Sequence, residues 1–196
     1  MGSATGRFGF DIKAWLQWTA VLFVFPVAGL LARAVAGPAD DFGAALLSGA
    51  IAGTLLGAGM WIALGRAVPV IWIPLTAGGL AVGLAFGAAV VGYRTGIVDL
   101  VSMGAVSGLA MGIGQWWLLR NGISRAVLWP LGMALAWAIG WGVTTAIGVD
   151  VALQWPVFGV SGAAVAMALS GALLAVLKAA HRRGLQTSAP RHGVST

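Results

Sequence analysis

Long apolar stretches alternate with short polar breaks along most of the chain. The hydrocarbon core of a bilayer is about 30 Å thick, so a helix that crosses it needs about 20 mainly apolar residues. Such stretches occur at residues 14–36, 42–64, 70–92, 99–119, 126–148 and 154–178, and the breaks between them contain the Gly, Pro, Asn and Asp residues typical of turns. The pattern predicts an all-α polytopic membrane helix bundle of about six transmembrane helices.

The connections between these stretches are too short to hold a soluble domain. Short loops place sequential helices side by side in antiparallel hairpins. We therefore expect one membrane domain at residues 14–178, preceded by an N-terminal segment at residues 1–13 and followed by a basic, disordered tail at residues 179–196. The first stretch is longer than the roughly 7 to 15 residues of a signal-peptide core, which favours a retained helix.

The composition separates the chain from soluble domains. Hydrophobic residues make up 60% of it and charged residues 8%, whereas soluble domains carry about 25% charged residues. The net charge of +6 does not indicate nucleic-acid binding, because most of the basic residues flank apolar stretches. The expected partners are membrane lipid and a membrane protein partner or a second copy of the chain, and no nucleic acid.

The basic residues are distributed unevenly between the two sides of the predicted bundle. One side holds Arg7, Lys13, Arg66, Arg120, Arg125, Lys178, Arg182, Arg183 and Arg191, and the other holds Arg33 and Arg94. Cytoplasmic loops carry the excess of Lys and Arg in membrane proteins, so we predict cytoplasmic N- and C-termini. The excess of Arg over Lys and the richness in Ala and Gly favour a bacterial plasma membrane.

The glycines of two predicted hairpins recur at a constant spacing. Positions 49, 53, 57 and 59 are followed 55 residues later by positions 104, 108, 112 and 114, and Trp61 is matched by Trp116. This agreement predicts an internal repeat with copies at about residues 42–92 and 99–148. Each copy has two crossings, so the copies share one orientation and form a parallel repeat. Whether the sixth and first spans form a third such hairpin is left open.

Small residues at every fourth position form a glycine-zipper stripe on one helix face, where a second helix can approach closely. The candidate helix-packing or path-lining residues are Gly49, Gly53, Gly57, Gly104, Gly108, Gly112 and Gln115. Packing is the preferred interpretation of the glycines, and a central path is the alternative. Gln115 lies inside an apolar span, where its amide needs a partner. An interhelical hydrogen bond is preferred over contact with a neutral solute or head group.

The ionisable residues argue against catalysis. The chain has neither Cys nor Glu, and no Asp, His or Lys lies near the middle of a predicted span. No catalytic, cofactor-binding or metal-binding constellation can be assembled from what remains, so we predict a protein that is not an enzyme and that uses no cofactor. Arg94 and Asp99 flank a predicted outer loop and are a candidate ion pair.

Two functions remain after these exclusions. The favoured one is an accessory, interaction or lipid-binding subunit of a membrane complex. The alternative is transport by a small channel or permease for a neutral or apolar solute. A path would require polar side chains to meet on one axis, drawn from Ser48, Ser102, Ser107, Thr144, Ser170 and Gln115. A scaffold would instead use its small residues for helix contacts.

Overall fold

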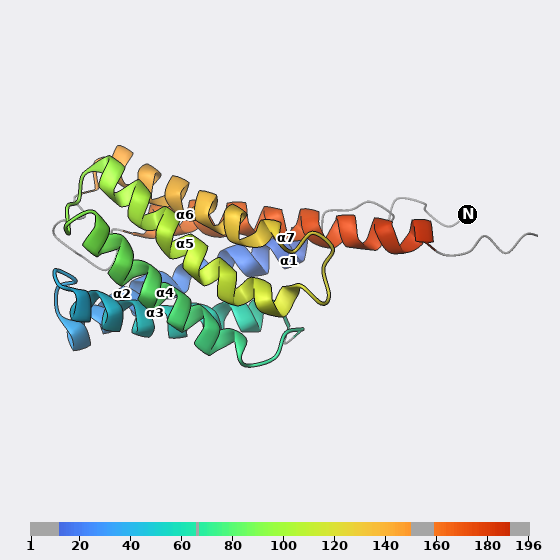
Figure 1. Cartoon of the computed structure of the whole chain (residues 1–196), viewed down its shortest axis with the longest axis horizontal. Helices are drawn as coiled ribbons and strands as arrows, with labels where there is room; N and C mark the ends of the chain where they lie inside the picture. Colours follow the sequence, from blue (N-terminus) through green and yellow to red (C-terminus); the bar gives the residue numbers. More distant parts are fainter. Residues whose placement is uncertain (1–11, 66, 150–158, 189–196) are drawn as a thin grey trace, which may run out of the picture.

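A computed structural model describes residues 12–65, 67–149 and 159–188, and every regular element in these ranges is helical (Figure 1). The elements are α1 (Ile12–Thr19), the 3-10 helix η1 (Ala20–Phe23), α2 (Val24–Ala36), α3 (Phe42–Ala63), α4 (Trp72–Val90), α5 (Ile97–Leu119), α6 (Leu128–Ala146) and α7 (Val160–Ser188). This architecture confirms the predicted all-α membrane helix bundle.

Five segments are long and apolar enough to cross a membrane: Ile12–Ala36, Phe42–Ala63, Trp72–Val90, Ile97–Leu119 and Val160–Gln186. The remaining helix, α6, has 19 residues and no charged side chain. Its Trp, Thr and Pro residues lower its mean hydropathy, although it packs between α5 and α7, which both qualify. The chain is therefore a multi-pass membrane protein.

The helices form a closed ring in which each one packs mainly against its neighbours in sequence. α2 lies against α3, α3 against α4, and so on to α7, and α1 returns to pack against α7 (Figure 1). Short loops make consecutive helices antiparallel. The helix ends near Lys13, Arg120 and Arg125 therefore share one end of the bundle, called here the basic end, and Lys178 of α7 lies at the same end. Asp40, Asp41, Arg94 and Asp99 lie at the other, acidic end.

The first crossing is interrupted where the chain changes from α1 to α2. Pro26 has no backbone N–H, and its ring collides with the carbonyl group four residues earlier, at Leu22. That carbonyl lies within η1, where the tighter 3-10 geometry replaces the α-helical hydrogen bonds. The crossing therefore continues through a local change of helix type rather than ending there.

Local chemistry explains several helix ends. The carboxylate of Asp41 accepts a hydrogen bond from the Ala44 N–H at 2.9 Å, which caps the first turn of α3. α4 and α6 end alike at their C-termini. Each is followed by a glycine in the left-handed region, Gly92 with φ 63° after α4 and Gly148 with φ 84° after α6. Only glycine adopts this conformation without a steric cost, so these two residues stop their helices.

The C-terminal helix differs from the prediction. Disorder was expected from residue 179, but α7 continues to Ser188 and projects beyond the other helices (Figure 1). Its 29 residues span about 43 Å, more than the roughly 30 Å of hydrocarbon. Good helix formers follow Lys178, and His181 bonds to the loop before α6.

Residues 1–11, 66, 150–158 and 189–196 lie outside the described ranges, with the predicted start of the sixth span at residues 154–158 among them.

Candidate functional site

The glycine stripes of α3 and α5 face the next helix in the chain. A Cβ atom at Gly49 would lie 2.6 Å from the Ala81 Cα atom of α4, and one at Gly53 would lie 2.7 Å from the Ala77 Cα atom. Gly57 approaches Thr76 and Ile73 of the same helix in the same way. The missing side chains therefore let the α3 and α4 backbones touch.

The corresponding glycines of α5 have the same relation to α6. A Cβ atom at Gly104 would lie 2.7 Å from the Trp137 carbonyl oxygen, and one at Gly112 would lie 2.8 Å from the Pro130 Cα atom. Gly108 lies directly against the Met133 carbonyl group. These six glycines thus lie at helix contacts. A third stripe, at Gly79, Gly83 and Gly87 of α4, faces α5.

Gln115 is the centre of a buried polar cluster at the basic end. Its Nε2 atom donates to Thr76 Oγ1 at 3.0 Å and lies 3.5 Å from Met60 Sδ, and its Oε1 atom accepts from Trp129 Nε1 at 2.9 Å. Thr76 Oγ1 in turn donates to the Trp72 carbonyl group of its own helix at 2.8 Å. Both ends of the amide are therefore satisfied by neighbouring helices.

This cluster continues across the rest of the bundle through two tryptophans. Trp129 contacts Trp18 edge-on, with ring centroids 6.0 Å apart, and Trp18 Nε1 donates to Ser170 Oγ at 2.9 Å. The central cluster, defined as Trp18, Met60, Thr76, Gln115, Trp129 and Ser170, draws one residue from each of α1, α3, α4, α5, α6 and α7. It therefore links every helix of the ring except α2.

Five of the six members of the central cluster are inaccessible to water, and the sixth, Trp18, is 2% exposed. Thr76, Gln115 and Ser170 have 0% exposure, as do Met60 and Trp129. The other polar side chains proposed for a path lie elsewhere. Ser107 is buried where α4 meets α5, Thr144 lies 3.3 Å from Ser161 between α6 and α7, and Ser102 bonds to the Val98 carbonyl group at an exposed position. Of the candidate path residues, only Gln115 and Ser170 therefore belong to the central cluster, where both are fully buried.

A cavity of about 310 Å³ opens at the basic end between α1, α3 and α7; it is called here the basic cavity. Its walls are mostly apolar, and its cations all come from α7. The lining residues are Ala14, Trp15, Trp18, Ala63, Leu64, Gly171, Leu174, Ala175, Val176, Lys178, Ala179, Arg182 and Arg183. A second hollow of about 280 Å³ shares Leu64, Lys178 and Arg182 with it. None of the lining residues of either hollow is acidic.

The extended part of α7 is held against the loop between α5 and α6. His181 Nδ1 lies 2.9 Å from Ser124 Oγ and accepts a hydrogen bond from the Ser124 backbone N–H at 3.2 Å. An acceptor role for Nδ1 requires that this atom carry no proton. The contact joins the extended part of α7 to this loop at the residue before Arg182.

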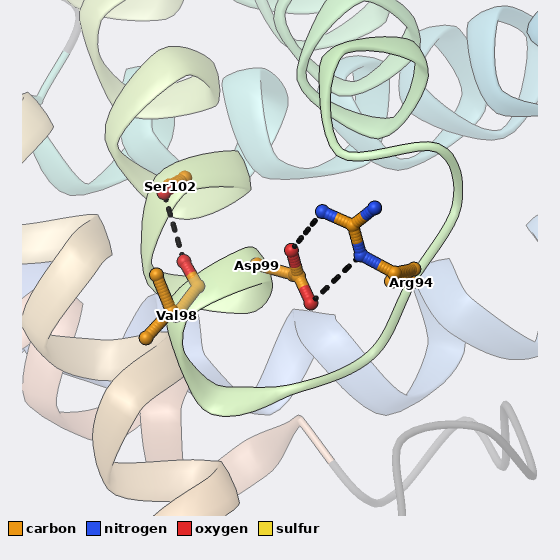
Figure 2. A network of polar contacts seen from close by, with 4 residues as sticks. All are labelled: Arg94, Val98, Asp99 and Ser102. Atoms are coloured by element: carbon orange, nitrogen blue, oxygen red, sulfur yellow. Dashed lines mark hydrogen bonds and ion pairs between the residues drawn. The ribbon is translucent and has the colours of Figure 1, made fainter.

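The candidate outer ion pair is formed at the acidic end (Figure 2). Arg94 and Asp99 make two hydrogen bonds, from Nη2 to Oδ1 at 3.0 Å and from Nε to Oδ2 at 3.4 Å. The hydrogen bond and the attraction of Asp99 raise the pKa of the Arg94 guanidinium above its ordinary value. The side chain of Arg94 is 70% exposed, so the pair ties a loop to the start of α5 at the surface.

Sequence reasoning singled out Gln115 but missed its partners and the basic cavity. Tryptophans close to the ends of membrane-spanning stretches are typical of an interfacial belt, whereas Trp129 and Trp18 are both buried in the core. No local pattern in the sequence specifies which indole donates to which amide. Within the described residues, no group of His or Asp side chains could hold a metal ion.

No protein-family model matches the chain, and the comparisons with curated proteins and with solved structures found no significant match either.

Proposed function

We propose that this membrane protein works by binding, as an accessory or lipid-binding subunit of a membrane complex, and that it neither conducts a solute nor catalyses a reaction. The observation that carries the proposal is the central cluster. A water-filled path leaves the side chains along it accessible to water, whereas Gln115 and its partners have 0% exposure. The cluster crosses the ring and occupies the position where a path between the helices would run.

The hydrogen bonds of the cluster also support a closed bundle. A polar group that is buried in an apolar medium without a partner costs about 1 to 3 kcal/mol, as judged from mutations in proteins. Both ends of the Gln115 amide already have partners, so a solute that displaced Thr76 or Trp129 would have to replace those bonds. This arrangement favours a permanent structural role for Gln115.

The surface that remains for partners is apolar. α2 packs mainly against α3 and exposes large side chains outward, among them Phe23 of η1 at its start and Val27, Leu30 and Val35 within it. Such a surface suits lipid or the helices of a membrane protein partner. We also infer that the basic end is cytoplasmic, because cytoplasmic loops carry the excess of Lys and Arg in membrane proteins. The excess of Arg over Lys and the Ala and Gly content support placement in a bacterial plasma membrane.

We further propose that the α3–α4 and α5–α6 hairpins are copies of one unit. Three features support this proposal. The stripe glycines of the first helix face the second helix in both hairpins, both second helices end at a left-handed glycine, and a tryptophan near the start of each second helix, Trp72 or Trp129, is fully buried. The pair formed by α7 and α1 has the related contact between Ser170 and Trp18.

The test is a permeability measurement on the purified full-length protein in liposomes. Stopped-flow light scattering would follow the entry of water, glycerol and urea, with protein-free vesicles and vesicles that contain an established pore as the two references. We expect rates equal to those of protein-free vesicles at every protein density. Solute entry that rises in proportion to protein density would overturn the proposal.

Native mass spectrometry of protein extracted gently from its own membrane gives the complementary result. A binding protein should leave the membrane with a partner subunit or with lipid attached, at a defined stoichiometry. A protein that carries neither under conditions that preserve known complexes of the same membrane would contradict the accessory role, whatever the permeability assay gives.

A further inference from the structure

We propose that the basic cavity is a binding site for one anionic phospholipid, whose phosphate lies against Arg182 and its basic neighbours and whose acyl chain lies along the apolar wall. This inference rests on the proposed function, because it names the ligand of a protein that acts by binding.

The wall of the cavity is apolar although it contains two indoles. Trp15 Nε1 donates to the Ala168 carbonyl group at 3.0 Å, and Trp18 Nε1 donates to Ser170 Oγ at 2.9 Å, so neither N–H group points into the cavity as a free donor. A Cβ atom at Gly171 would lie 2.8 Å from Cδ1 of Trp18 and 3.0 Å from Cδ1 of Trp15. The rings are thus seated against the α7 backbone and form a firm surface for a hydrocarbon chain.

The rim of the cavity is cationic. Lys178 and Arg182 are four residues apart on α7 and so lie on one helix face, and Arg183 follows beside them. A planar guanidinium can bind a phosphate through two parallel hydrogen bonds. The rim therefore selects an anionic head group over one of zero net charge.

The position of the cavity across the membrane matches the head group and the acyl chains of a phospholipid. Lys178 lies about 27 Å along α7 from Val160 at 1.5 Å per residue, close to the roughly 30 Å thickness of the hydrocarbon core. The cations therefore lie at head-group level, and Trp18, Gly171 and Leu174 lie below them at the depth of the acyl chains. A free phosphate ion would leave this wall uncovered, whereas a lipid fills both parts.

The experiment measures lipid binding to the detergent-purified full-length protein by native mass spectrometry, with phosphatidylglycerol and phosphatidylcholine of identical acyl chains. We expect phosphatidylglycerol to bind at one high-affinity site and phosphatidylcholine to bind much more weakly. Arg182→Gln should weaken the binding of phosphatidylglycerol about fivefold, the order expected for one cation beside an anionic head group. Ala175→Phe, which fills the apolar part, should weaken it about tenfold, as expected when two methylene groups lose their contact.

The matched control is Arg120→Gln. Arg120 lies at the same end of the bundle, where its guanidinium stacks over Trp117 at 5.5 Å, and it lines neither hollow. Its replacement removes the same charge as Arg182→Gln, so equal weakening by the two variants would mean general attraction to a basic surface and would overturn the site. Arg182 is exposed, so its variant should fold normally, and size-exclusion chromatography checks both variants.

Glycerol phosphate tests the contribution of the apolar wall. It carries the anionic group without a chain, and we expect it neither to bind nor to displace the lipid at the same concentration. Binding as tight as that of phosphatidylglycerol would overturn the proposal. If the purified protein shows no preference for phosphatidylglycerol and its liposomes conduct no solute, this site is refuted and the binding function stands. Solute entry into the liposomes would refute the function itself.

Discussion

Two adjacent glycines of α4 provide a matched test of the close helix packing. A Cβ atom at Gly79 would lie 2.5 Å from the Met111 Cα atom of α5, whereas nothing lies within 4 Å of a Cβ atom at Gly78. Both residues are in the interior of the same helix, so Gly79→Ala and Gly78→Ala add the same methyl group to the same kind of backbone. Only the first methyl group meets a neighbouring helix.

The expected loss of stability follows from this distance. An ordinary contact begins at 3.4 Å, so α4 and α5 must separate locally by about 1 Å to accept the methyl group at Gly79. A gap of that size removes about a quarter to a half of each neighbouring van der Waals contact. We expect Gly79→Ala to lower the free energy of unfolding by about 2 kcal/mol, which corresponds to a melting temperature lower by about 5 °C.

The assay is thermal unfolding of the purified protein in a mild detergent, followed by the fluorescence of its tryptophans. Gly78→Ala should melt at the temperature of the unmodified protein or slightly higher, because alanine favours a helix more than glycine does. Equal melting temperatures for the two variants would refute the packing argument, since they would mean that the α4–α5 contact accepts a methyl group without cost.

The remaining predictions concern the two polar contacts. Gln115→Leu leaves the buried Trp129 N–H without an acceptor and should lower the free energy of unfolding by about 1 to 3 kcal/mol. Trp129→Phe removes the donor instead, and the double variant should lose less than the sum of the two single losses; strict additivity would contradict the contact. Arg94→Gln should leave the melting temperature unchanged, because the Arg94 side chain is 70% exposed and its ion pair is screened by water.

The pH dependence of the outer pair follows from the direction of its pKa shift. The pKa of Arg94 is raised above its ordinary value in the folded protein, so any stabilisation is fully present below the ordinary pKa of arginine and is lost only as the pH rises through the folded-state pKa. From neutral to mildly alkaline pH the guanidinium stays charged in both the folded and the unfolded chain. A difference between the Arg94→Gln and unmodified proteins that grows over this range would contradict the assignment.

The closed ring explains why glycine is so frequent in the chain. Without a hydrophobic driving force between helices in lipid, association depends on close packing and on hydrogen bonds. The stripes of α3, α4 and α5 supply the first, each against the following helix. The central cluster supplies the second with bonds that run between different helices. Both devices favour a rigid structure.

The sequence by itself determined the class of the protein and the course of the chain. Apolar stretches of bilayer length require helices, because a backbone in lipid must satisfy its own hydrogen bonds, and short loops require antiparallel neighbours. Periodic glycines indicated which helix faces allow close approach. Left-handed glycines such as Gly92 and Gly148 also follow from local chemistry, since few other residues adopt that conformation. These features depend on residues that are near one another in the chain.

Only the tertiary structure decided which polar groups meet. Gln115 bonds to Thr76, 39 residues away, and Trp18 bonds to Ser170, 152 residues away, and no local pattern specifies either pairing. The basic cavity likewise needs α1, α3 and α7 to be brought together at one end of the ring. The extension of α7 to Ser188 was missed because charged residues were taken as the sign of a solvated tail. A helix that leaves the bilayer can carry such residues, and here they form the rim of the basic cavity.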